Sequence, residues 1–331
     1  MKRTSSEKYL GDIISNNGKI DENIEDRVNK GRGRINSIIS LLEEISFGEN
    51  YFEMALLFRN SMLINSLLSS SEVLYNVEKK HIDKLERCDK DLFARVLGVP
   101  STCSSEAFYL ETGVLPIKFI LQGRRLMYYR DLLRKSESEL VKKFFDTQKK
   151  FTSKNDWIIQ VQNDLKDLNI DKTEEEIIKM TKYSYKKLIK NKLKINATHS
   201  LFYDKSEEKR SKIKNLTSFK LQNYLRTNKF TTKQKKLLFS LRTRSIDVKN
   251  NYKNKFQFNM KCRMCEDENS IDSEEHYLKC SKILENFDDN EDILNAKYED
   301  IFSQNIDEQI SITRIFETIF KIRQKILNIK Y

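Results

Sequence analysis

The stretch GVLPIKFILQGRRLMYYR, residues 113–130, contains the last proline and the last glycine of the chain, Pro116 and Gly123. The 208 residues from Arg124 to Tyr331 contain neither of them. Turns between β-strands depend on both residues, so their absence argues against a β-rich architecture and against a glycine-rich phosphate loop in that part of the chain. We therefore expect a mainly helical fold.

Helix-boundary residues around this stretch agree. Pro116 suits the first turn of a helix, and the amphipathic pattern after it continues to about Arg134. Before it, Ser104 or Ser105 can cap a short helix through Leu110 that ends at Gly113. Further helices are predicted over residues 24–42, 51–75, 77–97, 156–168 and 174–189.

The N-terminus differs from the rest. Residues 8–15, KYLGDIIS, are typical of a β-strand. Asn16, Asn17 and Gly18 follow, and these residue types accept the positive φ of hairpin turns. We expect a small β-hairpin in front of a helical bundle.

Composition narrows the class of protein. The 331 residues are 38% hydrophobic and include 19 Phe and 14 Tyr, which is not a disordered composition. Five cysteines do not make a disulfide scaffold. The longest apolar stretch, residues 54–68, is interrupted by Arg59, Asn60 and Asn65, and residues 1–7 have no apolar run of a signal peptide. We expect a soluble intracellular protein, nuclear or cytoplasmic, that makes no membrane contact.

The net charge of +12 conceals three blocks. Residues 1–180 carry 29 basic and 29 acidic side chains. Residues 181–265 carry 24 basic and 4 acidic side chains, whereas residues 266–331 carry 8 basic and 16 acidic ones. Blocks of one sign indicate interaction surfaces more than they indicate fold.

The basic block has two interpretations. Lysines outnumber arginines there by 19 to 5, which suits contacts with phosphates more than bidentate recognition of bases. Its interleaved aromatic residues are suited to stack on unpaired bases, or else to form the cores of helices whose lysines face solvent. For each single aromatic residue we favour the core, and for the block as a whole we favour RNA or DNA as the partner. The aromatic residues are Phe202, Tyr203, Phe219, Tyr224, Phe230, Phe239, Tyr252, Phe256 and Phe258.

One constellation has the chemistry of a metal site. Cys262 and Cys265 form a C-x2-C pair, followed after ten residues by His276 and after three more by Cys280. Structural Zn²⁺ sites take four Cys or His ligands in a tetrahedron, and C-x2-C supplies two of them from one tight turn. His276 and Cys280 are four residues apart, so we expect them on successive turns of one helix. These four residues predict one closed structural Zn²⁺ site; the alternative is a chance grouping of reduced cysteines.

Catalytic constellations are not recognisable. His81 and Cys88 lie on a charged helix and are best explained by core or surface roles, and His199 lies among lysines without a carboxylate partner. Cys103 is a small residue in a serine-rich turn. No pair of aspartates lies on a short hairpin of the kind that holds metal ions in polymerases. We do not expect this chain to be an enzyme.

A series of short motifs runs along residues 8–284 in a fixed order. KYLG at 8–11, the NNG turn and DENI at 21–24 come first; LGVP at 97–100, SEA at 105–107, YLETG at 109–113, LPI at 115–117 and RRLMY at 124–128 follow; LRTR at 241–244 precedes the cysteine array. In this order they resemble the C-terminal part of a non-LTR (LINE-type) retrotransposon polyprotein, downstream of the reverse-transcriptase active site: end of the palm, thumb, linker and CCHC zinc knuckle.

The resemblance implies nucleic-acid contacts. Tyr9, Leu10 and Gly11 would correspond to the region that grips the primer end. The helix over residues 28–42 would correspond to a thumb helix along the template–primer duplex. Arginines and lysines on these elements become expected contacts, with helix-surface solubility as the alternative. The implied contacts are Lys30, Arg32, Arg34, Arg124, Arg125, Arg130, Arg134, Arg242 and Arg244.

The departures from the family define the expected activity. In the family, the metal-binding aspartates precede the palm hairpin, and this chain begins seven residues before that hairpin. A full-length relative would be an RNA-directed DNA polymerase. This chain is expected to bind nucleic acid as a fragment without polymerase or endonuclease residues, and polymerase activity would need a separate chain to supply the aspartates.

Two hypotheses follow for the whole chain. The first is the nucleic-acid-binding fragment. The second is a zinc-stabilised helical structural or protein-interaction protein, a decayed or repurposed retroelement product whose acidic tail folds back on the basic block. We divide the chain into an end-of-palm hairpin (1–20), a thumb-like bundle (21–135), a basic helical linker (136–255), the zinc knuckle (256–285) and an acidic helical tail (286–331).

Overall fold

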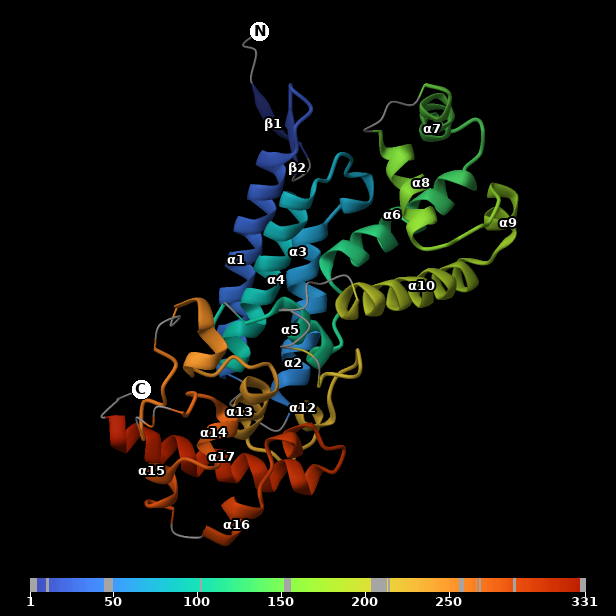
Figure 1. Cartoon of the computed structure of the whole chain (residues 1–331). Coiled ribbons are helices and arrows are strands. Elements are labelled where there is room, and N and C mark those ends of the chain that lie inside the picture. Colours follow the sequence, from blue (N-terminus) through green and yellow to red (C-terminus); the bar gives the residue numbers. More distant parts are fainter. Residues whose placement is uncertain are drawn as a thin grey trace. The chain divides into compact units, whose positions relative to one another are not determined.

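The computed structural model describes residues 5–9, 12–44, 50–101, 103–151, 156–203, 213, 215–255, 259–265, 267, 269–287 and 290–327. These residues are mainly helical, with an antiparallel hairpin at the N-terminal end, which confirms the expected fold class (Figure 1). The chain forms two compact units. Unit 1 comprises Met1–Leu41, Leu56–Leu92 and Val114–Lys205, and unit 2 comprises Leu42–Ala55, Phe93–Gly113 and Ser206–Tyr331.

These units do not follow the five predicted segments. Residues of the predicted bundle at 21–135 belong to both units. The predicted knuckle and the predicted acidic tail both belong to unit 2. Compactness therefore groups residues that are far apart in the sequence.

The N-terminal hairpin is present, but its turn is not where the sequence suggested. Strands β1 (Ser6–Tyr9) and β2 (Asp12–Ser15) pair antiparallel, with Tyr9 opposite Asp12. The pairing of Tyr9 with Asp12 ends the hairpin before Asn16, and residues 10 and 11 lie outside the described residues. Asn16–Gly18 instead connects β2 to the first helix: the Asn17 side chain accepts hydrogen bonds from the Ser15 hydroxyl (2.7 Å) and the Lys19 backbone N–H (2.9 Å), and Gly18 has a φ of 67°. Such Asx turns use the same residues as hairpin turns, so composition alone misplaced the reversal.

Within unit 1, helix α6 contacts η2, α7, α8, α9 and α10. Helices α1, α2 and α4 have residues in both units. The elements up to residue 202, apart from α5, are α1 (Asp21–Glu44), α2 (Tyr51–Phe58), η1 (Arg59–Leu63), α3 (Ile64–Leu68), η2 (Ser71–Val73), α4 (Lys79–Leu97), α6 (Ile117–Leu133), α7 (Leu140–Lys150), α8 (Trp157–Asp167), α9 (Glu174–Lys179) and α10 (Lys182–Phe202).

The single helix expected over residues 51–75 is wrong. A π-helical turn, η1, interrupts it at Arg59–Leu63, and α3 ends at Leu68. Buried Arg59 at the start of that turn donates to both carboxylate oxygens of Asp89, at 2.7 and 2.6 Å. Beyond Leu68 the chain enters three consecutive serines, a residue type that competes with helical hydrogen bonding, and Ser70 has a φ of 51°.

The predicted caps around residues 104–134 are confirmed. The Ser104 hydroxyl accepts from the Ala107 N–H (3.3 Å) and begins α5 (Ser105–Thr112), and Gly113 ends it with a φ of 65°. Pro116 precedes α6 (Ile117–Leu133) as its N-cap.

Unit 2 is built from short elements and one long C-terminal helix. Helix α17 packs on α13 and η4 and buries Ile312, Phe316 and Ile319, so the acidic C-terminal stretch supplies part of the core. Phe219, Tyr224, Phe230 and Phe239 of the basic block are also buried, as favoured for single aromatic residues. The elements are α5, α12 (Asn223–Arg226), α13 (Thr232–Arg242), η3 (Lys249–Lys255), α14 (Glu274–Tyr277), α15 (Ser281–Leu284), α16 (Asn290–Asn295), η4 (Tyr298–Phe302) and α17 (Ile306–Leu327).

Left-handed turns occur in the part of the chain that has no glycine. Asn169, just after α8, and Arg244, just after α13, each have a φ of 49°. Asparagine accepts this conformation more readily than arginine does. Arg244 therefore has a backbone conformation in which glycine is the usual residue.

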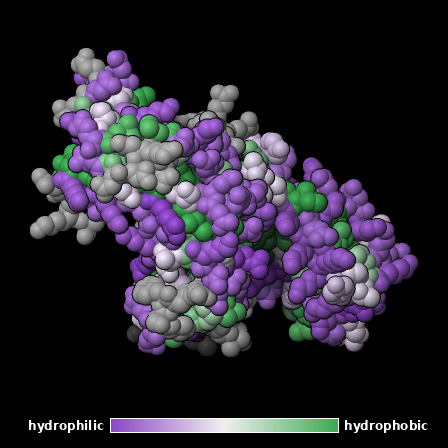
Figure 2. Space-filling view, turned by 90° about the horizontal axis from the view of Figure 1, so that it is seen from below, coloured by the Kyte–Doolittle hydropathy of each residue, from purple (hydrophilic) through white to green (hydrophobic). Residues whose placement is uncertain are grey.

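One face of the molecule is largely polar. On the face drawn in Figure 2, hydrophilic residues dominate and hydrophobic ones form separate patches. Among the described helices, none combines the length and the apolar character needed to cross a lipid bilayer.

Candidate metal centre and cationic residues

The four predicted metal ligands come together. One ligand atom from each of Cys262, Cys265, His276 and Cys280 lies within 4.8 Å of all the others, so this cluster could hold one metal ion. The Cys262 and Cys280 Sγ atoms are 4.0 Å apart, and the Cys265 Sγ is 3.3 Å from the His276 Nε2. A tetrahedral ion with bonds of about 2.3 Å needs ligand separations of about 3.8 Å. The cluster is close to that geometry.

Local backbone structure explains the approach of the two halves. Cys262 and Cys265 flank a turn in which the Met264 N–H donates to the Cys262 Sγ (3.4 Å). Lys261 pairs with Ile271 in an isolated antiparallel bridge, and the Cys262 N–H donates to the Ser270 carbonyl (3.1 Å). This bridge places the C-x2-C turn beside the segment that leads to His276.

The second pair of ligands is arranged differently from the prediction. His276 lies on the short helix α14, whose N-cap hydroxyl, on Ser273, accepts from the His276 N–H (3.1 Å). That helix ends at Tyr277, and Cys280 is the N-cap of α15. The expected single helix is therefore wrong. His276 and Cys280 belong to two short helices that meet at a bend, and this arrangement also brings their ligand atoms to one site.

Hydrogen bonds within the cluster shift the pKa values of three of its four groups. The hydrogen bond from the Cys280 thiol lowers the pKa of the Cys262 thiol, and the same hydrogen bond, together with burial, raises the pKa of Cys280. Hydrogen bonding to the Cys262 and Cys265 sulfurs raises the pKa of His276 to about 8. The protons on these groups compete for one small space, and a metal ion would replace them.

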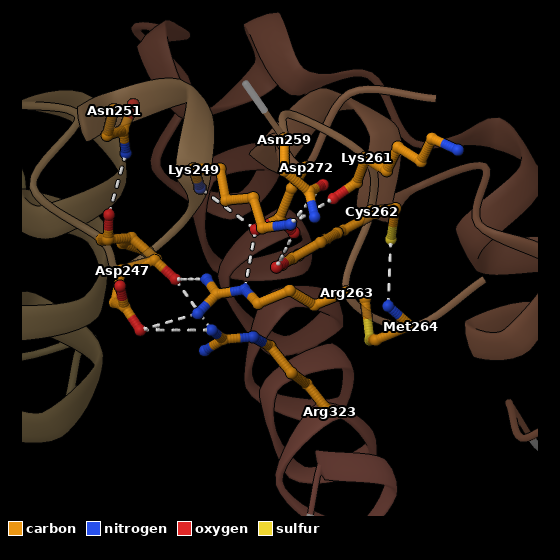
Figure 3. Close-up of polar contacts among 12 residues, drawn as sticks. Asp247, Lys249, Asn251, Asn259, Lys261, Cys262, Arg263, Met264, Asp272 and Arg323 are labelled. Carbon is orange, nitrogen blue, oxygen red and sulfur yellow. Dashed lines mark hydrogen bonds and ion pairs between the residues drawn. The ribbon is translucent and has the colours of Figure 1, made fainter. Parts of the chain in front are cut away.

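Asp272 organises the backbone around the cluster (Figure 3). Its Oδ1 accepts from the Tyr277 hydroxyl (2.6 Å), and its Oδ2 accepts from the Lys249 N–H (3.0 Å) and the Arg263 Nε (2.8 Å). The side chain is completely buried. In the sequence it is one of several acids between Cys265 and His276, and nothing there distinguishes it from exposed Asp267.

The cluster is also tied to the C-terminal helix. The Arg323 Nη2 on α17 donates to the Asp247 carbonyl (2.8 Å), and the Arg263 Nη1 donates to the Asp247 carboxylate (3.2 Å; Figure 3). Tyr277 meets Phe320 edge to face, with ring centroids 6.2 Å apart. The segment from Cys262 to Cys280 and the C-terminal helix α17 therefore pack together within unit 2.

Three of the arginines expected to contact nucleic acid are interior residues. Arg125 is buried and lies 3.1 Å from the Asp164 carboxylate. Arg242 is buried and donates from Nε and Nη2 to both oxygens of Glu111, each at 2.9 Å. Arg130 is buried and donates to the Met180 carbonyl (2.7 Å). Buried and paired, they cannot reach a phosphate in this fold, and we withdraw them as contacts.

The other expected contacts are nearer the surface. Arg32 and Arg34 are exposed on α1, as is Lys30, which pairs with Asp26 (2.6 Å). Half-buried Arg124 donates to the Leu68 carbonyl, exposed Arg134 donates to the Ile178 carbonyl (3.1 Å), and Arg244 pairs with Glu275 (2.7 Å). Leu10, Gly11 and the side chain of Tyr9 lie outside the described residues.

Among the described residues, helix α10 carries a row of exposed lysines to which the resemblance did not point. One side of the helix packs on α6 and buries Tyr185, Ile189 and Leu193. The other presents what we call the α10 lysine face: Lys182, Lys186, Lys187, Lys190 and Lys194, all exposed. Residues 177–203 contain no acidic side chain. The signal in the sequence was lysine at helical spacing within the basic block.

Comparisons of the chain with protein-family models, with curated proteins and with solved structures found no match. The likeness to non-LTR reverse transcriptases rests on the short motifs alone.

Proposed function

We propose that this chain binds RNA or DNA as a non-catalytic segment of the kind found downstream of the active site in non-LTR reverse transcriptases. The observation that carries the proposal is the α10 lysine face. Five exposed lysines on one helix, with no acid between residues 177 and 203, form a surface of one sign. Among these lysines one ion pair is seen in the described structure, between Lys182 and Asp131 at 3.7 Å. The face therefore keeps most of its charge for a phosphate backbone.

The physical basis is neutralisation of phosphates. Each lysine that contacts a phosphate releases condensed counterions, so affinity falls steeply with salt. Lysine is a point charge without the bidentate geometry of arginine, which suits recognition of the backbone without recognition of sequence. The paired arginines of the interior add nothing to this electrostatic attraction.

A titration of anisotropy against salt tests the proposal. Wild-type protein is expected to bind labelled RNA and DNA at low salt with a negative slope of log K against log salt. Replacing Lys186, Lys187, Lys190 and Lys194 by Gln should weaken binding and reduce the slope by about 3–4, nearly one for each phosphate that is no longer neutralised. The matched control removes four exposed or half-buried lysines that are already in ion pairs, and should change the slope much less. These are Lys80, Lys84, Lys135 and Lys172, paired with Asp21, Glu25, Glu139 and Glu176. Absence of binding at low salt would refute the proposed function.

We further propose that the metal is Zn²⁺ and that it is structural. Three thiols and one imidazole match the soft-to-borderline ligand set of closed zinc sites, and all four positions belong to the protein. Metal analysis of purified protein should give one zinc per chain. Cys262→Ser should lose it, whereas Cys103→Ser, a buried thiol outside the cluster, should keep it. Unchanged zinc content in Cys262→Ser would refute the assignment.

A structural or protein-interaction role is the second candidate. It is favoured by the contacts of the acidic tail with the basic block: Lys229 pairs with Asp307 (2.9 Å), and Gln234 donates to Glu317 (3.1 Å). Deleting the tail would remove core residues of α17, so a milder change is needed. If the tail masks a binding surface, Asp307→Asn with Glu317→Gln will tighten nucleic-acid binding. Unchanged affinity will show that the tail does not mask it.

A further inference from the structure

A cavity of about 480 Å³ lies within unit 1 between α6 and α10, beside η2. Its walls are mostly apolar: Leu115, Ile120, Met127 and Tyr128 are half-buried, and Ile189 and Leu193 are buried. Gly123 also lines it, and a Cβ there would meet the Leu193 Cδ1 at 2.8 Å. The glycine thus allows α10 to approach α6 at the base of the cavity. Its volume is in the range of small-molecule sites.

The cavity opens onto the α10 lysine face. Lys186 and Lys190 belong to both, and Arg124 lines the cavity from α6. Two carboxylates also line it. Asp131 is held by Arg130 at 3.4 Å and Lys182 at 3.7 Å, whereas the Glu72 carboxylate has no hydrogen bond or ion pair among the described residues. A ligand here would meet an apolar hollow, cations at its mouth and one carboxylate able to accept a hydrogen bond.

We infer that this cavity takes an unpaired nucleobase of a single-stranded RNA or DNA whose phosphates lie on the α10 lysine face. The inference rests on the proposed function and adds the class of nucleic acid. A nucleobase is a flat apolar ring with polar edges, joined to an anionic backbone, and these parts match the half-buried Tyr128 ring and apolar walls, the Glu72 acceptor, and Lys186 and Lys190. A paired base in a duplex is stacked within the helix and cannot enter. The geometry therefore favours single strands over duplexes.

The test compares a labelled single strand with the duplex of the same sequence, by anisotropy over a range of salt. Wild-type protein should prefer the single strand. Met127→Trp fills the cavity without changing charge, so it should reduce single-strand affinity by roughly five- to 150-fold, the reduction expected when one base–aromatic stack is removed. It should leave duplex affinity and the salt slope unchanged. Met62→Trp, at a half-buried methionine of unit 1 outside the cavity, is the matched control and should change neither affinity.

Photo-crosslinking gives a second measurement that does not depend on how the variant folds. A strand that carries 4-thiouridine should crosslink wild-type protein to peptides containing Met127, Tyr128 or Leu193. Crosslinks confined to other peptides would overturn the inference. Equal affinity of wild-type protein for single strand and duplex would do the same, as would a single-strand affinity of Met127→Trp equal to that of wild-type protein. In those cases nucleic-acid binding itself persists, and the cavity belongs to a different apolar ligand. Absence of any nucleic-acid binding is a separate result, which refutes the proposed function as well.

Discussion

The lysines of α10 and the arginines near the end of the basic block carry the same charge in opposite surroundings. On α10 five lysines are exposed and no acid lies nearby in the sequence. Arg242 is buried between both oxygens of Glu111 and the Ile301 carbonyl, and Arg263 bonds to Asp272 and Asp247. Equal charge therefore has different uses: the guanidinium groups of Arg242 and Arg263 connect segments inside the fold, and the ammonium groups of the α10 lysine face remain at the surface. A sum of charges along the chain cannot separate the two.

Among the buried features, the candidate metal site should have the largest effect on the free energy of unfolding. Removing the ion by a strong chelator, or by Cys280→Ser, should destabilise unit 2 by on the order of 5 kcal/mol or more, because metal-binding energy contributes directly to folding. The hydrogen bonds that Arg263, Asp272 and Arg323 make beside the cluster should be weakened at the same time. Thermal unfolding with and without added zinc measures the effect. A melting temperature unchanged by chelation would contradict it.

The Glu111–Arg242 pair comes next in size. Arg242→Met leaves the Glu111 carboxylate buried without its guanidinium and should lower the free energy of unfolding by about 3–5 kcal/mol. The double variant Glu111→Leu, Arg242→Met should be more stable than the single one, because neither charge is then left alone. Denaturant unfolding checks both. A double variant less stable than the single would mean that Glu111 still stabilises the fold through its other partner, the Tyr224 hydroxyl, once the guanidinium is gone.

The close approach of residues 220–221 to α5 can be tested through the backbone. Gly113 has a φ of 65°, and a Cβ there would meet the Leu221 N at 2.4 Å and the Lys220 C at 2.6 Å. Gly113→Ala should therefore lose about 2–3 kcal/mol of stability. Gly33→Ala is the control: it lies inside α1 with nothing near its Cβ position, and alanine there should gain about 0.5–1 kcal/mol.

Buried Asp164 should make the free energy of unfolding depend on pH. Burial raises its pKa to about 6, against the opposing effects of Arg125 and Gln122, with Asp167 and Lys118 as further charges nearby. A raised pKa in the folded state means stability that is full below the unfolded pKa of about 3.9 and is lost as pH rises through 6. Relative to Asp164→Asn, which cannot titrate, wild-type protein should lose about 1–3 kcal/mol between pH 4 and 7. A difference independent of pH would contradict this.

The exposed side should hardly affect stability. Replacing Lys186, Lys187, Lys190 and Lys194 by Gln should change the free energy of unfolding by about 0.5 kcal/mol or less, as for ordinary surface positions. Its effect belongs to nucleic-acid affinity. A large loss of stability would mean that these lysines have a structural role, and would contradict the contrast drawn here between the exposed lysines and the buried arginines.

Prediction from the sequence succeeded where the signal is local. Capping by Ser104, termination at Gly113 and the start after Pro116 depend on the chemistry of a few neighbouring residues, and the four metal ligands were recognisable by spacing. It failed where the outcome depends on distant partners. Nothing near Arg125 or Arg242 in the sequence indicates Asp164 or Glu111, which are 39 and 131 residues away. The burial of Asp272 depends likewise on Lys249, which is 23 residues away.

The left-handed turn at Arg244 bears on how this sequence can drift. A non-glycine residue in that conformation stores about 1–3 kcal/mol, whereas the ion pair of Arg244 with Glu275 at 2.7 Å contributes about 1 kcal/mol or less. Exchange for glycine would relax the backbone and remove the ion pair, and the greater freedom of glycine in the unfolded chain would offset part of the gain. Glycine would also lose the contact of Arg244 with the Tyr298 ring, whose centroid is 5.3 Å away, which contributes about 0.5–1 kcal/mol. The backbone strain and the lost contacts are therefore similar in size, so the fold does not require glycine at this position.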